Sequence, residues 1–496
     1  MRNPLFRHPR PVLLVVALIA LLGSALLAWE RREGMLSRDE MAYRFQAHIF
    51  EGGKLVATAP PGVVLAQDVP KEIHFAYHLV TPRGWYGMYP LGWPLVLAAG
   101  GALHIGWLTN PLLGVLLVWL TWRLGSVCFS EDVGLVSALL LFPCPFFFIN
   151  TSGDLSHPLA ACIVTAALCL VETGVRRQSI ARLVLAVGLL GLSLFVRPFT
   201  AVAAAATVGL VLVFRLRRDR LLLSLVPWAI GALAATIALM AAENVYQTGS
   251  VLKSGYALYA GKGSPPEVTL NLHAILAASP REAARSLAIT LLNTTPFLFV
   301  LAGYALFRAQ VLIGTKALLV GVFTGSVLLY MLDVIPNILF FGQRMYFEGL
   351  PGIAVLAGAG LVTLLNRWKI RTTAVPLAAV LLGGGQLAQY WFTVSEVQAL
   401  IEPSVDYLHV LRSVSCSKCV VFLRSENLTP FDNLAPANFN VNDPDWPQAR
   451  HLYLIDPGPS RRDEITRKYR RGQWAVVVFD GATRLPRIEI AWRQSR

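Results

Sequence analysis

Charged residues are scarce in this chain. Asp, Glu, Lys and Arg make up 15% of the 496 residues, whereas hydrophobic residues make up 55%. A soluble fold cannot hide this much apolar surface, since about a quarter of an average soluble domain is charged. We therefore interpret the chain as a polytopic α-helical membrane protein.

Acidic residues are fewer than basic ones, and the net charge is +14. The excess does not indicate a nucleic-acid partner, because Lys and Arg gather in short clusters between apolar runs. The three main clusters are RRQSIAR, RLRRDR and NRWKIR, which begin at Arg176, Arg215 and Asn366. This distribution is typical of cytoplasmic loops in membrane proteins.

The N-terminus lacks a recognisable cleavage site. A basic segment precedes an apolar run from Pro11 to Trp29, and no small-x-small pattern follows it before Glu30. We therefore expect a retained first span rather than a signal peptide. With the basic N-terminus in the cytoplasm, the loop that follows lies outside.

The segment from Gly92 to Trp107 is short, begins Gly-Trp-Pro and contains His104. As a span it would place all three basic clusters outside, so we predict an interfacial or re-entrant helix. This leaves about eleven transmembrane helices, a large first outer loop (residues 30–109) and an outer C-terminus. The predicted spans are 11–29, 110–124, 133–149, 157–174, 181–196, 199–214, 221–242, 287–307, 312–331, 350–366 and 373–392.

Long apolar runs are absent after Trp391. Residues 393–496 instead contain three β-rich segments, at Cys419–Arg424, His451–Asp456 and Trp474–Phe479, and a helix expected at Arg461–Arg470 with Ser460 as its N-cap. We predict a transmembrane domain over residues 1–392 and a small α/β extracytoplasmic domain over residues 393–496, to which we assign no catalytic group.

Cysteines number only six. Cys416 and Cys419 form a CSKC on the outer side, and the absence of a second CxxC argues against structural zinc. A disulfide and two thiols both remain open.

The most informative stretch lies just beyond the first span, from Met35 to Leu55. It carries Asp39 and Glu40, and adjacent carboxylates at a membrane surface cost solvation energy unless they pair, bind a cation or do chemistry. Asp154 lies in a second outer loop, NTSGDLSH. We interpret all three as catalytic, with a divalent metal cation as a candidate ligand and otherwise no cofactor.

The outer face has no nucleotide sugars or ATP, so an enzyme there needs an activated donor carried by the membrane, such as a polyprenyl-phosphate sugar. Transfer to a hydroxyl acceptor needs a base, for which Asp39 is suited, and cations for the departing phosphate. The candidate groups for substrate and phosphate binding come from four outer segments: Arg83, Tyr89, His157, Lys253, Arg344 and Tyr346.

Two further histidines, His74 and His78, are spaced four apart in HFAYH. On a helix they would share one face and permit metal binding, but a third ligand is missing.

The order of these segments resembles the GT-C superfamily of integral membrane glycosyltransferases, in the branch of protein O-mannosyltransferases and the lipid A aminoarabinose transferase. The matching segments, which fall within residues 10–395, are RDEMAYRFQAHIFEGGKL, YPLGWPLVLAAGG, SGDLSHPLA, FVRPFTA, YQTGSVLKSGY and FGQRMYFEGLP. The C-terminal domain fits only loosely.

The resemblance implies that Asp39 is the catalytic carboxylate, Glu40 its partner and Asp154 the second acidic residue. It also implies inverting transfer of a hexose or pentose from a polyprenyl-phosphate donor to a glycolipid, polysaccharide or protein, in a bacterial inner membrane with a periplasmic active site. The aminoarabinose transferases place a Lys near YPLGW, and this chain has none there. Phosphate recognition then falls to Arg83, Lys253 and Arg344.

Two alternatives stay open. A lipid-linked oligosaccharide ligase or polymerase would centre its Arg and His residues on a late outer loop rather than on an early Asp-Glu pair. A lipid or sugar transporter would carry charges within its spans, whereas the predicted spans are nearly free of acids and show no inverted repeat.

Overall fold

The computed structural model describes residues 9–63, 69–216, 220–260, 284–295, 297–330, 338–339, 342–368, 374–428 and 439–494. The chain forms two compact units. The first, here the helical unit, comprises Met1–Ala28, Leu108–Met240 and Glu267–Val394. The second, here the mixed unit, comprises Trp29–Trp107, Ala241–Pro266 and Ser395–Arg496.

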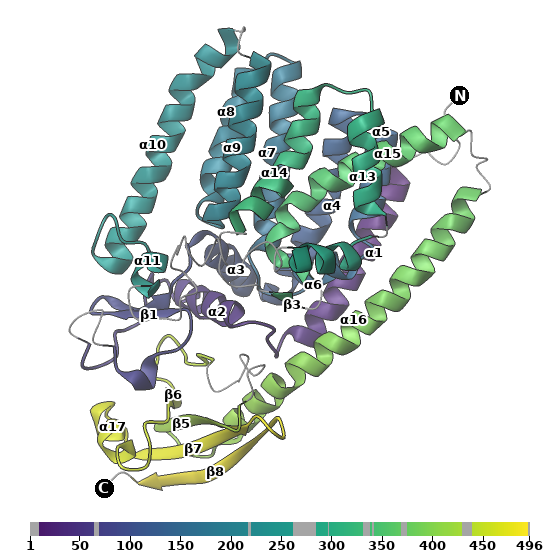
Figure 1. Ribbon diagram of the computed structural model, residues 1–496. Helices are drawn as coiled ribbons and strands as arrows, with labels where there is room; N and C mark the ends of the chain where they lie inside the picture. Colours follow the sequence, from purple (N-terminus) through teal and green to yellow (C-terminus); the bar gives the residue numbers. More distant parts are fainter. Residues whose placement is uncertain are drawn as a thin grey trace. The chain divides into compact units, whose positions relative to one another are not determined.

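The helical unit is a bundle in which α4, α5, α7, α9, α14 and α15 run side by side (Figure 1). The helices α1, α10 and α16 each begin in the helical unit and end in the mixed unit. Its helices are α1 (Pro9–Arg31), α4 (Thr109–Cys128), α5 (Glu131–Leu141), α6 (Pro145–Asn150), α7 (His157–Arg176), α8 (Ile180–Ser193), α9 (Pro198–Leu216), α10 (Arg220–Thr248), α13 (Leu298–Arg308), α14 (Ile313–Tyr330), α15 (Leu350–Trp368) and α16 (Ala374–Ser413).

A short hairpin precedes α15. It pairs β3 (Ile338–Leu339) with β4 (Gly342–Gln343) and leads into the 3-10 helix η5 (Arg344–Gly349).

Within the described residues, seven helices are long and apolar enough to cross a membrane, or eight if a bent pair counts as one span. The expectation of a multi-pass membrane protein is therefore confirmed. The count of eleven spans stays a prediction.

Two predicted spans are not single straight helices. The segment 133–149 divides into α5 and α6, because Pro143 and Pro145 interrupt the helical hydrogen bonds. The segment 287–307 divides into Ala284–Asn293 and α13, with a bend of 100° between them. Phe297 takes a left-handed backbone conformation (φ 62°) at this bend.

Small residues let the helices approach closely. A Cβ added at Gly125 on α4 would lie 2.7 Å from the Cα of Gly134 on α5. Such contacts are typical of helix packing in membranes, where apolar burial alone provides little drive for association.

One buried acid lies within the predicted span 157–174. Glu172 on α7 is fully buried and pairs with Arg176 at 2.7 Å and Arg215 at 2.6 Å. Thr315 on α14 also donates to it. The carboxylate is thus neutralised and ties α7, α9 and α14 together.

The first part of the mixed unit is the loop after α1. It contains α2 (Arg38–Glu51), η2 (Lys71–Ile73), the antiparallel pair β1 (His78–Thr81) and β2 (Gly84–Gly87), α3 (Gly92–Ala102), η3 (Gly106–Leu108) and, from a later segment, α11 (Gly255–Ala260). The 11 residues of α3 measure about 16 Å, half the hydrocarbon core of about 30 Å. This length agrees with the predicted interfacial or re-entrant helix.

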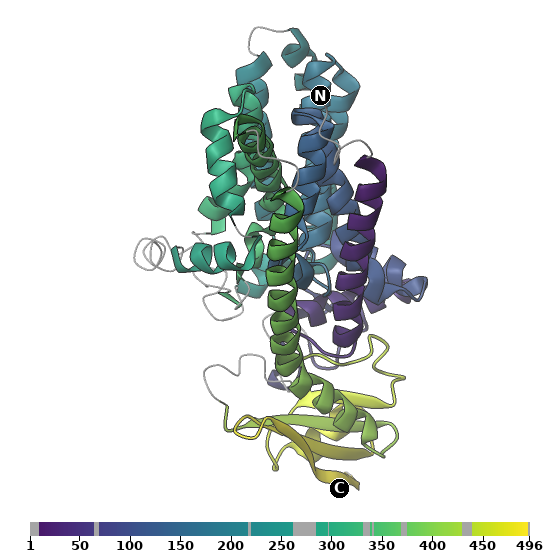
Figure 2. The same cartoon turned by 90° about the vertical axis from the view of Figure 1, so that its right-hand side faces the viewer.

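The C-terminal part of the mixed unit is a four-stranded sheet in the order β6-β5-β7-β8. Its strands are β5 (Cys419–Glu426), β6 (His451–Ile455), β7 (Gln473–Asp480) and β8 (Leu485–Gln494), and the first three are parallel. The last turns of α16 pack on this sheet (Figure 2), where the rings of Tyr407 and Phe479 are 6.2 Å apart. The expected small α/β region is confirmed.

The helix of this region starts later than predicted. α17 runs over Arg462–Lys468 with Arg461, not Ser460, as its N-cap. Tertiary contacts set its start, since Arg462 forms a bidentate pair with Asp456 and Asp463 accepts a hydrogen bond from Trp474.

Candidate active site

The predicted catalytic carboxylates lie at the beginning of α2. Ser37 is its N-cap in an extended conformation, and Asp39 and Glu40 lie in the first turn. The N-terminus of a helix carries a partial positive charge, which stabilises carboxylates there. Asp39 is half-buried, whereas Glu40 is buried.

Glu40 is bound by the end of the first span. Its Oε1 accepts a hydrogen bond from Arg31 at 2.6 Å, and both side chains are buried. Its Oε2 accepts from the backbone N–H groups of Leu36 (2.7 Å) and Ser37 (3.2 Å). Glu40 therefore fixes the start of α2 against α1, so its geometry favours a structural role over the catalytic one predicted from the sequence.

Sequence reasoning missed this role, although a signal existed. Ser37 and Glu40 have the Ser-x-x-Glu spacing of a capping box. In the sequence, the ion pair of Glu40 was indicated only by the presence of a basic residue, Arg31, at the end of α1.

Asp39 is held by Tyr89. The Tyr89 hydroxyl donates a hydrogen bond to Oδ1 of Asp39 across 50 residues of sequence. Burial, and next the Asp39 carboxylate, raise the pKa of Tyr89 well above its usual value, so the hydroxyl stays protonated and acts as the donor. The structure thus brings together two of the predicted site residues.

Three further tyrosines surround Tyr89. Its ring centroid lies 4.5 Å from that of Tyr43 on α2, 5.8 Å from Tyr77 and 5.7 Å from Tyr256 on α11. Tyr77 has a left-handed backbone (φ 62°), and its carbonyl accepts from the N–H of Met88. We call Tyr43, Tyr77, Tyr89 and Tyr256 the tyrosine cluster.

The predicted cations of the mixed unit are exposed. Arg83 follows β1, and its Nε would lie 3.4 Å from a Cβ added at Gly249, just after α10. Lys253 follows the same helix, and its carbonyl accepts from Thr248. The structure brings both residues to the end of α10.

The predicted shared helix face for His74 and His78 is wrong. His74 follows the 3-10 helix η2 and is exposed, whereas His78 begins β1 and is buried. His78 uses Nδ1 to bond the carbonyl of Ala76 at 2.7 Å. Burial lowers its pKa to about 4, so the side chain is neutral at pH 7.

The remaining predicted residues belong to the helical unit. Asp154 is half-buried in the loop before α7. Asn110 on α4 shapes this loop, because its amide donates to the carbonyls of Gly153 and Leu155, the latter at 2.9 Å.

A buried polar network lies next to this loop. Oε1 of Glu348 in η5 bonds Nδ1 of His157 at 3.0 Å and pairs with Nε of Arg197 at 2.9 Å. Arg197 also donates to Ser156 (3.2 Å) and Tyr330 (3.1 Å). Glu348 and Arg197, which were not among the predicted site residues, therefore join η5, α14 and the start of α7.

Arg344 and Tyr346 are also buried, in the same 3-10 helix. Tyr346 packs against Phe323 on α14, with ring centroids 5.7 Å apart. His157, Arg344 and Tyr346 thus share one region of the helical unit with Arg197.

Among the described residues, one group has the proximity of a metal site: Cys416, Cys419 and His451. Cys416 and Cys419 form a disulfide, which decides between the two alternatives left open by the sequence. Glu40, a predicted metal ligand, has both oxygens engaged by Arg31 and backbone N–H groups. This arrangement does not fit a cation held by Glu40, so we derive no step through a metal.

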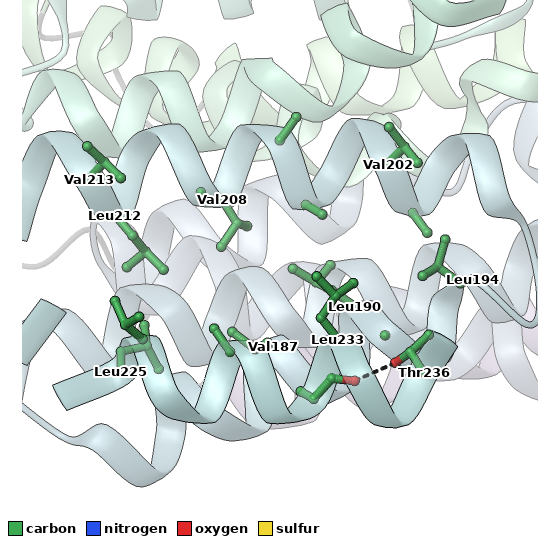
Figure 3. Close-up of a pocket in the computed structure, with 18 residues that line it drawn as sticks. Val187, Leu190, Leu194, Val202, Val208, Leu212, Val213, Leu225, Leu233 and Thr236 are labelled. Atoms are coloured by element: carbon green, nitrogen blue, oxygen red, sulfur yellow. Dashed lines mark hydrogen bonds between the residues drawn. The ribbon is translucent and has the colours of Figure 1, made fainter. Parts of the chain in front are cut away.

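An apolar groove lies between α8, α9 and α10 (Figure 3), with a volume of about 520 Å³. Leu190, Val208 and Leu233 are typical of its lining, and the one polar side chain is Thr236. The Thr236 hydroxyl donates to the carbonyl of Ala232 on its own helix, so the groove offers no unsatisfied donor. Such a surface suits a hydrocarbon chain.

Comparisons with known proteins agree with this geometry. Residues 103–242 match the family model described as dolichyl-phosphate-mannose-protein mannosyltransferase. The crystal structure of ArnT from Cupriavidus metallidurans bound to undecaprenyl phosphate is similar with a TM-score of 0.57 at 11% identity, covering 93% of this chain and 92% of that chain. The chain therefore shares the overall fold of this structure.

A second GT-C structure is also similar. The apo oligosaccharyltransferase of Archaeoglobus fulgidus gives a TM-score of 0.55 at 12% identity, covering 95% of this chain and 69% of that chain. No curated protein matches the chain significantly in sequence. The resemblance to GT-C glycosyltransferases expected from the sequence is confirmed.

Proposed function

We propose that this protein is an inverting glycosyltransferase that moves a sugar from a polyprenyl-phosphate donor to an acceptor on the outer face of a bacterial inner membrane. Asp39 is the general base. The donor and an acceptor hydroxyl on a glycolipid, polysaccharide or protein are its substrates.

The observation that carries the proposal is the placement of Asp39. It lies in the first turn of α2, eight residues after the end of α1, and one oxygen is held by Tyr89. Its neighbour Glu40 is neutralised by Arg31. Of the two adjacent carboxylates, the half-buried Asp39 is thus the one suited to proton transfer.

The reaction follows from this role. The Asp39 carboxylate takes the proton of the acceptor hydroxyl while the acceptor oxygen attacks the anomeric carbon. The bond from that carbon to the phosphate oxygen breaks, and the electron pair leaves with the polyprenyl phosphate. Attack opposite the leaving group inverts the anomeric centre.

The donor assignment rests on two features of the helical unit. Arg344 and Arg197 place two guanidinium groups in its polar network, and Glu348 supplies one carboxylate. We assign Arg344 to the donor phosphate, which a guanidinium binds with two parallel hydrogen bonds. We assign the polyprenyl chain to the apolar groove, since ArnT, with the same fold, is bound to undecaprenyl phosphate.

The outer location is supported by the Cys416–Cys419 disulfide in the mixed unit, which also contains Asp39. Disulfides persist in oxidising compartments and are rare in the cytosol. The active site is accordingly proposed to face the periplasm.

The test uses the full-length protein in lipid nanodiscs. Undecaprenyl-phosphate sugars and the matching nucleotide sugars are supplied separately with a membrane lipid extract as acceptor, and mass spectrometry follows the products. We expect the protein to transfer sugar only from the lipid-linked donor. Transfer from the nucleotide sugar, or no mass difference in envelope glycans and lipids after gene deletion, would contradict the proposal.

A further inference from the structure

Tyr89 connects the predicted catalytic carboxylate with a part of the loop 50 residues away in sequence. Its hydroxyl donates to Oδ1 of Asp39, and its side chain is only 7% exposed. A buried hydroxyl that donates to a carboxylate stabilises the ionised form of that carboxylate and restricts its rotation.

The position of Tyr89 is itself fixed from two sides. The N–H of the preceding Met88 donates to the carbonyl of Tyr77 at 2.9 Å. On the other side α11 begins at Gly255, where any Cβ would collide with the Met88 carbonyl. Only glycine permits this approach, so the backbone before Tyr89 has little freedom.

The rings of the tyrosine cluster complete the enclosure. Tyr43 lies one turn after Asp39 on α2 and contacts the Tyr89 ring at 4.5 Å, and Tyr77 and Tyr256 contact it from two other segments. Tyr89 is buried within this cluster, and burial strengthens its hydrogen bond to the carboxylate.

We propose that Tyr89 is the positioning residue of the catalytic base: its hydroxyl fixes the orientation of Asp39 and keeps it ionised. This inference rests on the proposed role of Asp39. It gives Tyr89 a different task from the substrate or phosphate binding expected from the sequence.

The charged and titratable groups in this region are few. Among the described residues, α2 contributes Arg38, Glu40, Tyr43 and Arg44, and the end of α1 adds Arg31. Glu243 on α10 accepts a hydrogen bond at 3.2 Å from the N–H of Leu91, two residues after Tyr89. Glu40 and Arg31 neutralise each other, and the three rings that face Tyr89 are those of Tyr43, Tyr77 and Tyr256. Tyr89→Phe itself removes one hydroxyl and neither adds nor removes a formal charge.

The experiment compares Tyr89→Phe with Tyr86→Phe. Both variants keep the ring, and Tyr86 is a buried neighbour whose hydroxyl donates to the carbonyl of Gln247 at 2.6 Å. The titration of Asp39 is measured in nanodiscs by infrared difference spectroscopy of its carboxyl group, assigned by subtracting Asp39→Asn.

We expect Tyr89→Phe to raise the proton affinity of Asp39 by about ten- to a hundredfold, a shift of roughly 1–2 pH units to higher pH. Tyr86→Phe leaves the titration at the wild-type pH. In transfer assays the acid limb of the pH–rate profile of Tyr89→Phe shifts to higher pH together with the Asp39 titration. The kcat falls, while the KM for the donor is unchanged. A wild-type titration in Tyr89→Phe, or an equal shift in Tyr86→Phe, would overturn the inference.

A second variant covers the case in which Tyr89→Phe does not fold. Site-specific 3-fluorotyrosine at position 89 keeps the ring and makes the hydroxyl a stronger hydrogen-bond donor. The Asp39 titration is therefore expected to move to lower pH. An unchanged titration, or a shift to higher pH, would contradict the inference. The infrared titration needs no sugar transfer. If the wild-type protein transfers no sugar, the proposed function fails, yet the coupling of Tyr89 to Asp39 is still measured.

Discussion

The ion pair between Arg31 and Glu40 gives a quantitative prediction. The two atoms are 2.6 Å apart, and the side chains are 2% and 1% exposed. Removing one partner of a buried pair leaves the other charge uncompensated, which costs about 3–5 kcal/mol. We therefore expect Glu40→Gln to destabilise the start of α2 by roughly this amount.

The matched control is a solvent-exposed pair of the same unit. Lys54 and Asp445 are 3.8 Å apart, with side chains 52% and 55% exposed. Asp445→Asn is expected to cost at most about 1 kcal/mol, because water and salt screen such pairs. The double variant Arg31→Met with Glu40→Gln should recover most of the stability lost in Glu40→Gln alone, since it removes both charges and keeps a side-chain oxygen that can accept from the N–H groups of Leu36 and Ser37.

The assay is hydrogen exchange of the peptides that cover α2, together with thermal unfolding in nanodiscs. Glu40→Gln is expected to speed exchange in α2, and Asp445→Asn to leave it unchanged. If Glu40→Gln unfolds and exchanges like Asp445→Asn, the reasoning about this pair is refuted.

Three further predictions follow from other parts of the chain. Gly209 lines the apolar groove and Gly231 does not, and a Cβ added at either position meets nothing within 4 Å. In kinetic assays we therefore expect Gly209→Phe to raise the KM for a polyprenyl donor. Gly231→Phe is the control and should leave this KM unchanged. Burial lowers the pKa of His78 to about 4, below its unfolded value of about 6.5. Between these two pH values the unfolded state binds more protons than the folded state, so the free energy of unfolding falls by up to about 3 kcal/mol as pH drops from 6.5 to 4. His78→Asn should flatten this dependence in pH-resolved thermal unfolding. Replacing Cys416 and Cys419 by Ser removes a very short loop constraint and should cost about 2 kcal/mol in denaturant unfolding, whereas an unchanged midpoint would show that the disulfide does not stabilise the fold.

Much of the fold could be predicted from the sequence because hydrophobic length and basic clusters report directly on a membrane. The first span, the helix at α4 and the parallel strands β5, β6 and β7 all lie where apolar runs indicated. The interruption between α5 and α6 was missed, since the apolar run continues through it and only Pro143 and Pro145 carried the signal.

The candidate site was harder to predict, because its contacts join segments far apart in the sequence. Asp39 and Tyr89 are 50 residues apart, and no local pattern pairs them. Glu348 and His157 are separated by 191 residues. Residue type alone identified both Asp39 and Glu40 as candidate catalytic acids, but it could not predict the buried ion pair that Glu40 forms with Arg31.

The most direct measurement is the rate of sugar transfer by Asp39→Asn in nanodiscs, beside wild type and Asp445→Asn. The side chain keeps its size but loses the charge that accepts a proton. The account predicts normal insertion, retained binding of polyprenyl phosphate and a loss of kcat of about a hundredfold or more. Transfer by Asp39→Asn at the wild-type rate would show that another group activates the acceptor.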